Sequence, residues 1–291
     1  MSKIAAVLFT MALLVVSAAG QPAYLKDVEK WRAEHLAELV SDDGWLTVAG
    51  LFWLKEGVNT VGSGDEYDVH LTPNFKQGKF GEIEFHGGVA TLKVGPDIDA
   101  RAAGKPVSEI QLVSDEQQKQ TVIEVGSQTF YLLKRGDRYG IRLKDKASPE
   151  RAGFKGLNWY PVNRSYRIVA DYEPYAEVRE VEIANVLGGV FRMKAPGVLR
   201  FKIRGKEFTL QPVIEGDKLF IIFRDLTSKT ETYGSGRYLY AAKAVNGKVV
   251  LDFNKAENPP CAFTPFATCP LPPRQNRLDV AIGAGEKRYH P

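Results

Sequence analysis

Residues 82–94 read Glu82-Ile-Glu-Phe-His-Gly-Gly-Val-Ala-Thr-Leu-Lys-Val94 and carry a clear structural signal. On both sides of His86-Gly87-Gly88, apolar and polar residues alternate with a period of two, which is the repeat of a β-strand with one buried face. Paired glycines accept the positive φ angles that a tight hairpin turn requires. These residues therefore predict a β-hairpin.

Similar β-rich segments, bounded by turn residues, follow one another about every ten residues from Trp45 onward. The first set is Trp45–Leu54, Val58–Val61, Tyr67–Leu71, Glu82–Phe85, Val89–Val94, Thr121–Val125, Thr129–Leu133 and Tyr139–Leu143. The second set is Tyr166–Ala170, Val178–Ile183, Val190–Met193, Leu199–Ile203, Phe208–Pro212, Leu219–Phe223, Tyr238–Ala244 and Val249–Phe253. Asn246-Gly247 predicts that the last two segments form a hairpin.

One helix is predicted before the strands, at Tyr24–Val40, where apolar residues recur at three- and four-residue steps. We expect it to pack on the outside of a sheet. A boundary between two β lobes is placed near Ser148-Pro149. The predicted organisation is all-β: a signal peptide at 1–20, the helix within 21–44, a first lobe at 45–147 and a second lobe at 148–291.

The N-terminus has the layout of a secretory signal peptide. Lys3 precedes an apolar run at residues 4–16, and small residues follow at Ser17-Ala18-Ala19-Gly20. An uncleaved anchor is the alternative, but the run is shorter than the ~20 residues that span a bilayer. We therefore predict a periplasmic or secreted protein, cleaved after Ala19 or Gly20 and without a stable membrane anchor afterwards.

Composition excludes several classes of protein. The 291 residues include 44% hydrophobic and 25% charged residues, which is typical of a soluble globular chain. Lys and Arg total 39 against 35 Asp and Glu, a formal net charge of +4, so the composition does not predict nucleic-acid binding.

The C-terminal residues differ from the strands before them. Six of the 16 prolines lie between Pro259 and Pro273, which disfavours helix and central strand alike. The segment is either a disordered tail or an ordered strap across the second lobe. Because it carries Phe263, Phe266 and both cysteines, we interpret it as a strap.

Several motifs resemble one known family. They are Gly50-Leu51-Phe52-Trp53-Leu54, Tyr233-Gly234-Ser235-Gly236-Arg237-Tyr238-Leu239, Asp252-Phe253-Asn254, Asn258-Pro259-Pro260-Cys261-Ala262-Phe263-Thr264-Pro265, Thr268-Cys269-Pro270-Leu271-Pro272-Pro273, Asn276-Arg277-Leu278 and Ala284-Gly285-Glu286-Lys287. The chain resembles the prokaryotic "domain of unknown function 1684" family over nearly all of its mature length. This resemblance implies no activity, cofactor or catalytic residue.

The first lobe also resembles the opening of a forkhead-associated β-sandwich, at residues 56–63 and 67–71. Forkhead-associated domains hold phosphothreonine with an arginine after the glycine and a later Ser-x-x-His pair. Ser63 stands where that arginine would be, and residues 75–82 contain no Ser-x-x-His. The resemblance therefore implies a shared scaffold without phosphothreonine recognition.

Common cofactor motifs are absent from the sequence. None of the four histidines lies four residues from another, and no Cys-x-x-Cys occurs, so we expect no metal site. His35 and His86 are interpreted as solvated or capping side chains. The glycine-rich motifs that bind ATP and NAD are missing as well, so we expect no cofactor.

Polar residues near strand ends of the second lobe form the candidate site. They are Asp225, Tyr233, Arg237, Asp252 and Asn254, with Glu286 returning from the tail. Residues at strand ends can converge on one mouth of a β scaffold, and the planar guanidinium of Arg237 suits a carboxylate or phosphate. The alternative is a buried Asp225–Arg237 ion pair with a purely structural role.

Two functions remain open from the sequence. The first is a binding or envelope-associated interaction module that takes an unknown small-molecule or protein ligand at a polar cleft around Arg237. The second is a metal-independent hydrolase that uses Asp252 and Glu286 as carboxylates. Whether the protein is an enzyme is left open.

Cys261 and Cys269 are predicted to form a disulfide, because export permits oxidation and the turn signal at Thr264-Pro265 permits closure. Two buried thiols are the alternative.

Overall fold

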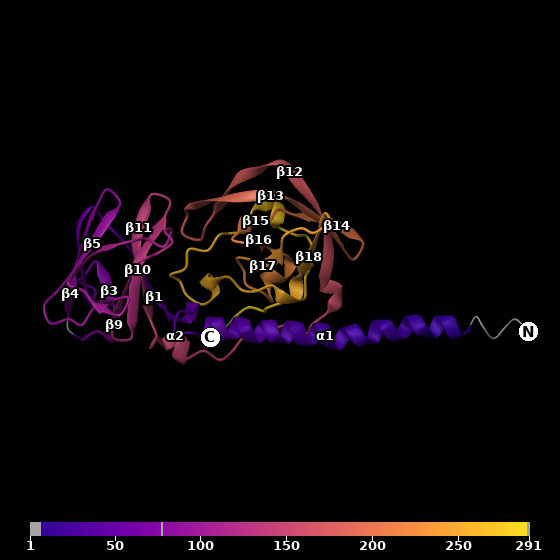
Figure 1. Cartoon of the computed structure of the whole chain (residues 1–291), viewed down its shortest axis with the longest axis horizontal. Coiled ribbons are helices and arrows are strands. Elements are labelled where there is room, and N and C mark those ends of the chain that lie inside the picture. The colour runs from indigo at the N-terminus through magenta and orange to yellow at the C-terminus, as the bar shows by residue number, and fades with distance from the viewer. Residues whose placement is uncertain (1–6, 77, 290–291) are drawn as a thin grey trace, which may run out of the picture.

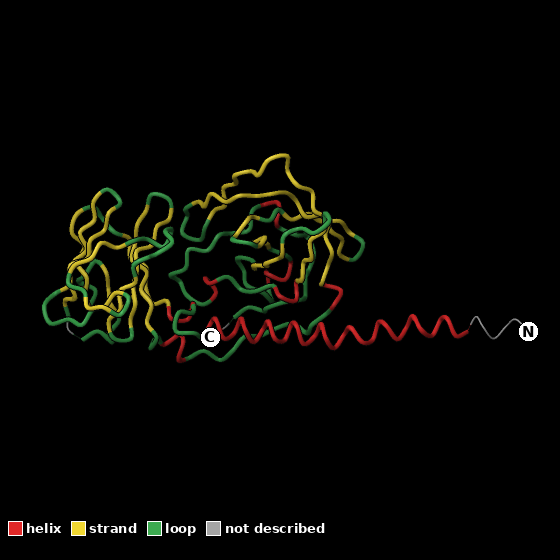
Figure 2. Tube along the Cα trace, in the orientation of Figure 1, coloured by secondary structure: helices red, strands yellow, loops and turns green. Residues whose placement is uncertain are grey.

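The computed structural model describes residues 7–76 and 78–289. Strands fill four sheets that form two β lobes, and one long helix lies along the base of the second lobe (Figures 1 and 2). The predicted all-β class with one N-terminal helix is confirmed.

The first lobe contains eleven strands in two sheets. They are β1 (Val48–Trp53), β2 (Gly57–Ser63), β3 (Val69–Leu71), β4 (Lys79–His86), β5 (Val89–Val94), β6 (Arg101–Ala102), β7 (Lys105–Pro106), β8 (Glu109–Leu112), β9 (Val122–Val125), β10 (Gln128–Arg135) and β11 (Arg138–Asp145). The sheet orders are β1-β11-β10-β9-β6-β7 and β3-β2-β4-β5-β8.

These two sheets share one apolar core, which makes the first lobe a sandwich. Phe130 of β10 meets Phe80 of β4 edge to face, with 5.6 Å between ring centroids. The hairpin predicted at His86-Gly87-Gly88 joins β4 to β5, and both glycines have positive φ. The short strands β6, β7 and β8 were not predicted, because two to four residues are too few to show a period.

The second lobe contains seven strands in two sheets. They are β12 (Arg167–Ala184), β13 (Val190–Ile203), β14 (Lys206–Leu210), β15 (Val213–Glu215), β16 (Lys218–Phe223), β17 (Arg237–Ala242) and β18 (Lys248–Asp252). The sheet orders are β14-β13-β12-β18 and β15-β16-β17. The connection from β11 to β12 contains α2 (Pro149–Ala152) and the 3-10 turn η2 (Arg164–Tyr166), and η1 (Trp45–Thr47) precedes β1.

Two predictions for the second lobe need correction. β12 and β13 were each predicted as two short strands, but each is one long strand, and their pairing is interrupted between Pro174 and Arg179. The turn at Asn246-Gly247 forms with positive φ at both residues, but the flanking strands separate: β17 pairs with β16, and β18 pairs with β12. The burial of β17 and β18 in two different sheets outweighs the preference of Asn246-Gly247 for joining two paired strands.

Helix α1 spans Val7–Leu39, so it begins earlier than the predicted Tyr24 and runs through most of the segment interpreted as a signal peptide. Residues 1–6 of that segment lie outside the described residues. Among the residues that the structure describes, no helix is long and apolar enough to cross a membrane. The C-terminal half of α1 packs against η4 (Phe253–Lys255) and against Trp159, rather than on the face of a sheet.

Beyond β18 the chain runs through η4, η5 (Pro260–Ala262) and η6 (Arg274–Asn276) without a further named strand. The remaining 3-10 turn, η3 (Leu226–Lys229), precedes β17. Isolated bridges pair Tyr238 with Glu257, Asn185 with Pro270 and Arg224 with Arg277. Leu278 and Ile282 enter the main core of the second lobe. The C-terminal segment therefore contributes to the packing around β17.

Candidate functional site

Arg237, the first residue of β17, is a buried side chain with 1% of its surface exposed. Its Nη2 donates to Asp225 Oδ2 at 2.7 Å and to the carbonyl of Ile282 at 3.0 Å, and its Nη1 donates to the carbonyl of Ala284. Asp225 also caps η3 by accepting from the Thr227 amide at 2.9 Å. A buried charge needs such partners to offset the loss of water.

The expected polar cleft around Arg237 is therefore not present in this arrangement. Asp225 and Arg237 form a buried ion pair, which was the purely structural alternative considered from the sequence. Because Arg237 also donates to two carbonyls of the tail, the pair links the tail to β17. The guanidinium has no face available to a ligand, because the tail covers it.

Asp252 and Asn254 form a second network, at the end of β18 and in η4. Asp252 Oδ1 accepts from Tyr24 Oη at 2.8 Å, and Asn254 Nδ2 donates to the carbonyl of Asn163 at 2.9 Å. Burial and the Asp252 carboxylate raise the pKa of Tyr24 above its usual range. This network attaches helix α1 to the second lobe.

Glu286 belongs to a third network and has no exposed surface. Its carboxylate accepts from the amide of Asn258 at 3.0 Å and from Asn258 Nδ2 at 2.6 Å. His35 of α1 lies between two carboxylates: its Nε2 is 3.4 Å from Glu286 Oε2, and its Nδ1 is 3.4 Å from Glu257 Oε2. At that length both are ion-pair contacts rather than well-formed hydrogen bonds.

Glu257 and His35 of this third network have pKa values above their usual ones. Burial raises the pKa of Glu257 to about 7, and Glu286 adds to the effect. Burial lowers the pKa of His35, but the carboxylates of Glu286 and Glu257 outweigh it, so the net pKa is raised. The ring of His35 also stacks on Trp31, with 5.3 Å between centroids.

His35 was misjudged from the sequence as solvated or capping, whereas its side chain is only 16% exposed. The residue spacing could have indicated that His35 is buried. His35 lies on the same helical face as Val28 and Leu39, and both of these residues are buried. Glu257 and Asn258 were not singled out, because only the folded tail brings them to α1.

Tyr233 donates from its hydroxyl to the carbonyl of Cys261 at 2.9 Å. The Cys261 amide donates in turn to Cys269 Sγ at 3.1 Å, and both cysteines are free thiols in this structure. The predicted disulfide is therefore not formed here, although the turn has brought the two residues together.

The six candidate residues thus divide among separate networks. In the described part of the chain, neither Asp252 nor Glu286 contacts Arg237. No group of three or more metal-ligating side chains was found among the described residues.

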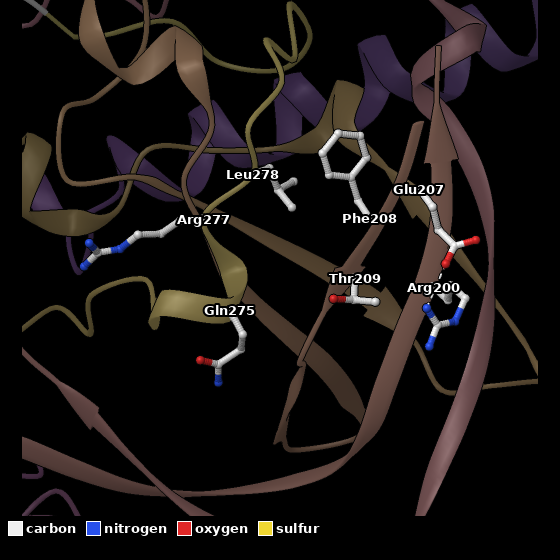
Figure 3. Close-up of a pocket in the computed structure, with 7 residues that line it drawn as sticks. All are labelled: Arg200, Glu207, Phe208, Thr209, Gln275, Arg277 and Leu278. Carbon is white, nitrogen blue, oxygen red and sulfur yellow. Dashed lines mark hydrogen bonds and ion pairs between the residues drawn. The ribbon is translucent and has the colours of Figure 1, made fainter. Parts of the chain in front are cut away.

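An open groove lies elsewhere in the second lobe, between the edge strand β14 and η6. It encloses a volume of about 270 Å³ and is lined by Arg200, Glu207, Phe208, Thr209, Gln275, Arg277 and Leu278. Phe208 and Leu278 are 8% and 5% exposed, and they supply its apolar part. Figure 3 shows Arg277 on the opposite side of the groove from the Arg200–Glu207 pair, with its guanidinium directed away from the other lining residues.

The two arginines of the groove differ in their partners. Arg200 bonds Glu207 at 2.8 Å and Glu173 at 2.7 Å. Arg277 is exposed and, across the ranges 7–76 and 78–289, lies in no ion pair. Its backbone bridge partner, Arg224, is also exposed, and Arg224 Nε donates to Ser228 Oγ at 3.2 Å.

Comparisons with known proteins bear on residues of the second lobe and the tail. The model of the family described as "Protein of unknown function (DUF1684)" matches residues 152–287. The Gly50–Leu54 motif that also suggested this family lies outside the matched range. No curated protein matches the chain.

Two solved structures are similar to parts of the chain. The solution structure of an uncharacterised protein from locus rrnAC0354 of Haloarcula marismortui is 31% identical, covers 48% of this chain and 80% of its own, and has a TM-score of 0.41. A structure titled Rv0020c_FHA is 22% identical, covers 33% of this chain and 94% of its own, and has a TM-score of 0.21. Neither the family description nor the first title assigns an activity. The family match covers the second lobe and the tail, so residues 152–287 are similar to the DUF1684 family.

Proposed function

We propose that this protein is an exported binding module and that the groove beside β14 holds its ligand. The observation that carries the proposal is the position of Arg277 at the edge of a cavity of about 270 Å³, with an exposed side chain that has no carboxylate partner among the described residues. The ligand is a small anion that carries an apolar group.

The anionic part of the ligand is inferred from charge. A guanidinium presents a planar set of donors that matches a carboxylate or phosphate. The backbones of Arg224 and Arg277 pair in an isolated bridge, so a second cationic residue lies next to Arg277. Thr209 and Gln275 add polar side chains to the same lining.

The apolar part is inferred from Phe208 and Leu278. Both line the groove with only 8% and 5% of their surfaces exposed, so they offer an apolar group of the ligand a small contact area. Small-molecule sites commonly combine an apolar lining with a few polar groups that orient the ligand.

Binding is favoured over the alternative of hydrolysis by Asp252 and Glu286. Glu286 has no exposed surface, and Asn258 occupies both of its oxygens. Asp252 is bonded to Tyr24 and to the neighbouring Asn254. A hydrolase would need both carboxylates free to face one substrate.

The groove is tested by titrating the exported chain with phenyl phosphate, inorganic phosphate and benzyl alcohol, with backbone amide shifts as the readout. We expect phenyl phosphate to bind most tightly, with a dissociation constant of about 1 mM and the largest shifts in β14 and η6. Arg277→Gln should weaken it about tenfold, whereas Lys119→Gln, an exposed cation of the first lobe, should not. Equal binding by Arg277→Gln, shifts elsewhere, or no binding of phenyl phosphate would overturn the proposal.

Export is a proposal that rests on the N-terminal sequence alone. The intact mass of the protein recovered outside the cytoplasm should correspond to a chain beginning near Gln21. A chain that retains Lys3 would contradict it.

A further inference from the structure

The C-terminal segment places two thiols side by side and holds both backbones in position. The Cys261 carbonyl accepts from Tyr233 Oη at 2.9 Å, and the Cys269 carbonyl accepts from the amide of Val186 at 3.0 Å. Tyr238 Oη binds the next carbonyl, that of Pro270, at 3.0 Å. The juxtaposition of the cysteines is therefore built by three separate contacts to the second lobe.

The two cysteines differ in exposure. Cys269 is 4% exposed and packs in an apolar cluster with Phe220, Ile222 and Ala267. Cys261 is only partly buried, at the edge of the same cluster. An incoming molecule can therefore reach Cys261 more readily than Cys269.

We propose that Cys261 and Cys269 form a thiol–disulfide exchange site, in which Cys261 attacks an incoming disulfide and Cys269 then resolves the mixed disulfide. The substrate class is a low-molecular-weight or flexible peptide disulfide. This activity is separate from ligand binding at the groove, which shares no residue with the cysteine pair.

The pKa values of the two cysteines agree with Cys261 as the attacking thiol and Cys269 as the resolving thiol. Hydrogen bonding from Cys269, and then from Tyr233, lowers the pKa of Cys261 despite burial. The interaction with Cys261 and burial together raise the pKa of Cys269. The thiolate is the nucleophile in thiol–disulfide exchange, so the partly exposed Cys261 is the first to react.

The reaction balances in two steps. The Cys261 thiolate attacks one sulfur of R–S–S–R, which forms a Cys261–S–S–R bond and releases RS⁻. Cys269 loses its proton to water and attacks the Cys261 sulfur, which forms the Cys261–Cys269 disulfide and releases the second RS⁻. Two protein thiols are oxidised, the substrate disulfide is reduced, and the two thiol protons end on the two RSH products.

Oxidised glutathione is the probe for this site, with acid-quenched samples analysed by intact mass and peptide mapping. The reduced exported chain should lose both thiols without accumulating a mixed disulfide. Cys269→Ser should accumulate one glutathione on Cys261. Cys261→Ser should react at least tenfold more slowly than Cys269→Ser. Faster trapping on Cys269 than on Cys261 would overturn the assignment.

A second measurement uses the unsubstituted protein, so it does not depend on whether the variants fold. Limiting iodoacetamide should alkylate Cys261 before Cys269 in the reduced chain. Equal or reversed labelling contradicts the proposal, as does a wild-type chain that keeps two free thiols after prolonged exposure to oxidised glutathione.

Discussion

Arg237 and Arg277 occupy the same lobe, and both lie in the range that the DUF1684 family model matches, yet their surroundings are opposite. Arg237 is enclosed, with Asp225 and two tail carbonyls as acceptors. Arg277 lies beside an open groove and pairs with no carboxylate in the described ranges. A guanidinium that is buried against a carboxylate and backbone carbonyls stabilises the fold, whereas one left at a groove remains available to an anion.

The largest expected effect is on the enclosed arginine. Arg237→Met should lower the free energy of unfolding by about 3–5 kcal/mol, because the buried Asp225 carboxylate loses its cation. Urea unfolding of the protein, followed by circular dichroism, measures this loss. Arg192→Met, which removes a solvent-exposed ion pair with Glu182, is the matched control and should cost less than about 1 kcal/mol. If the two variants lost similar amounts of stability, the buried Arg237 would contribute no more to the free energy of unfolding than the exposed Arg192.

A smaller loss is expected at the enclosed glutamate. Asn258→Ala removes the side-chain donor to Glu286, which has no exposed surface and would be left buried with one hydrogen-bond partner fewer. Hydrogen bonds to charged groups are worth ~2 kcal/mol, so the same urea assay should show a loss of that order. Gln118→Ala at an exposed position of the first lobe should leave stability unchanged. An unaffected Asn258→Ala would mean that Glu286 does not need this donor.

The attachment of α1 should depend on pH. Glu257 has a pKa of about 7 in the folded chain, against 4.5 when free, and the pKa of His35 is raised from 6.5. Both groups bind protons more tightly when folded. Their stabilisation is therefore present at low pH, and it is lost as pH rises, from 4.5 to about 7 for Glu257 and above 6.5 for His35.

Glu257→Gln tests this dependence, because the amide cannot titrate. Between about pH 5 and pH 8, wild type should lose roughly 1–2 kcal/mol of stability relative to the variant. Urea unfolding at a series of pH values, monitored by the fluorescence of Trp31 and Trp159 beside His35, provides the measurement. His86→Gln, at an exposed histidine, serves as the control. A constant difference between wild type and Glu257→Gln would show that Glu257 does not carry the extra proton.

The smallest effect on stability is expected at the groove. Arg277→Gln should change the free energy of unfolding by less than about 0.5 kcal/mol, because it removes no buried contact. A small loss for Arg277→Gln and a large loss for Arg237→Met in the same urea assay would show that only the buried arginine stabilises the fold. A loss above about 1 kcal/mol would assign Arg277 a structural role and weaken the binding proposal.

Local features of the fold could be predicted well, and long-range ones less well. The β4–β5 hairpin was recognised because Gly87 and Gly88 accept the turn geometry and the flanking residues alternate. The turn at Asn246-Gly247 was recognised as well, but not the divergence of β17 and β18 into different sheets. A turn depends on two residues, whereas strand pairing depends on which sheet buries each side chain.

The candidate site shows the same division. The sequence indicated that Asp225, Arg237 and Glu286 were unusual, and it left a buried ion pair open as an alternative. It could not indicate that Arg237 would be covered by carbonyls of Ile282 and Ala284, some 45 positions further along the chain. The groove was missed because its lining comes from β13, β14 and η6, which no short motif connects.

By itself, the sequence determined the β class, the turns and the amphipathic helix, because each of these follows from the φ/ψ preferences and polarity of neighbouring residues. Tertiary structure alone decided which polar residues are enclosed and which are open. Whether Arg237 meets water or Asp225, and whether His35 meets solvent or two carboxylates, depends on where the C-terminal segment and α1 pack. The electrostatic free energy of a charged side chain depends on burial and on the partners brought to it, and both arise only when distant segments fold together.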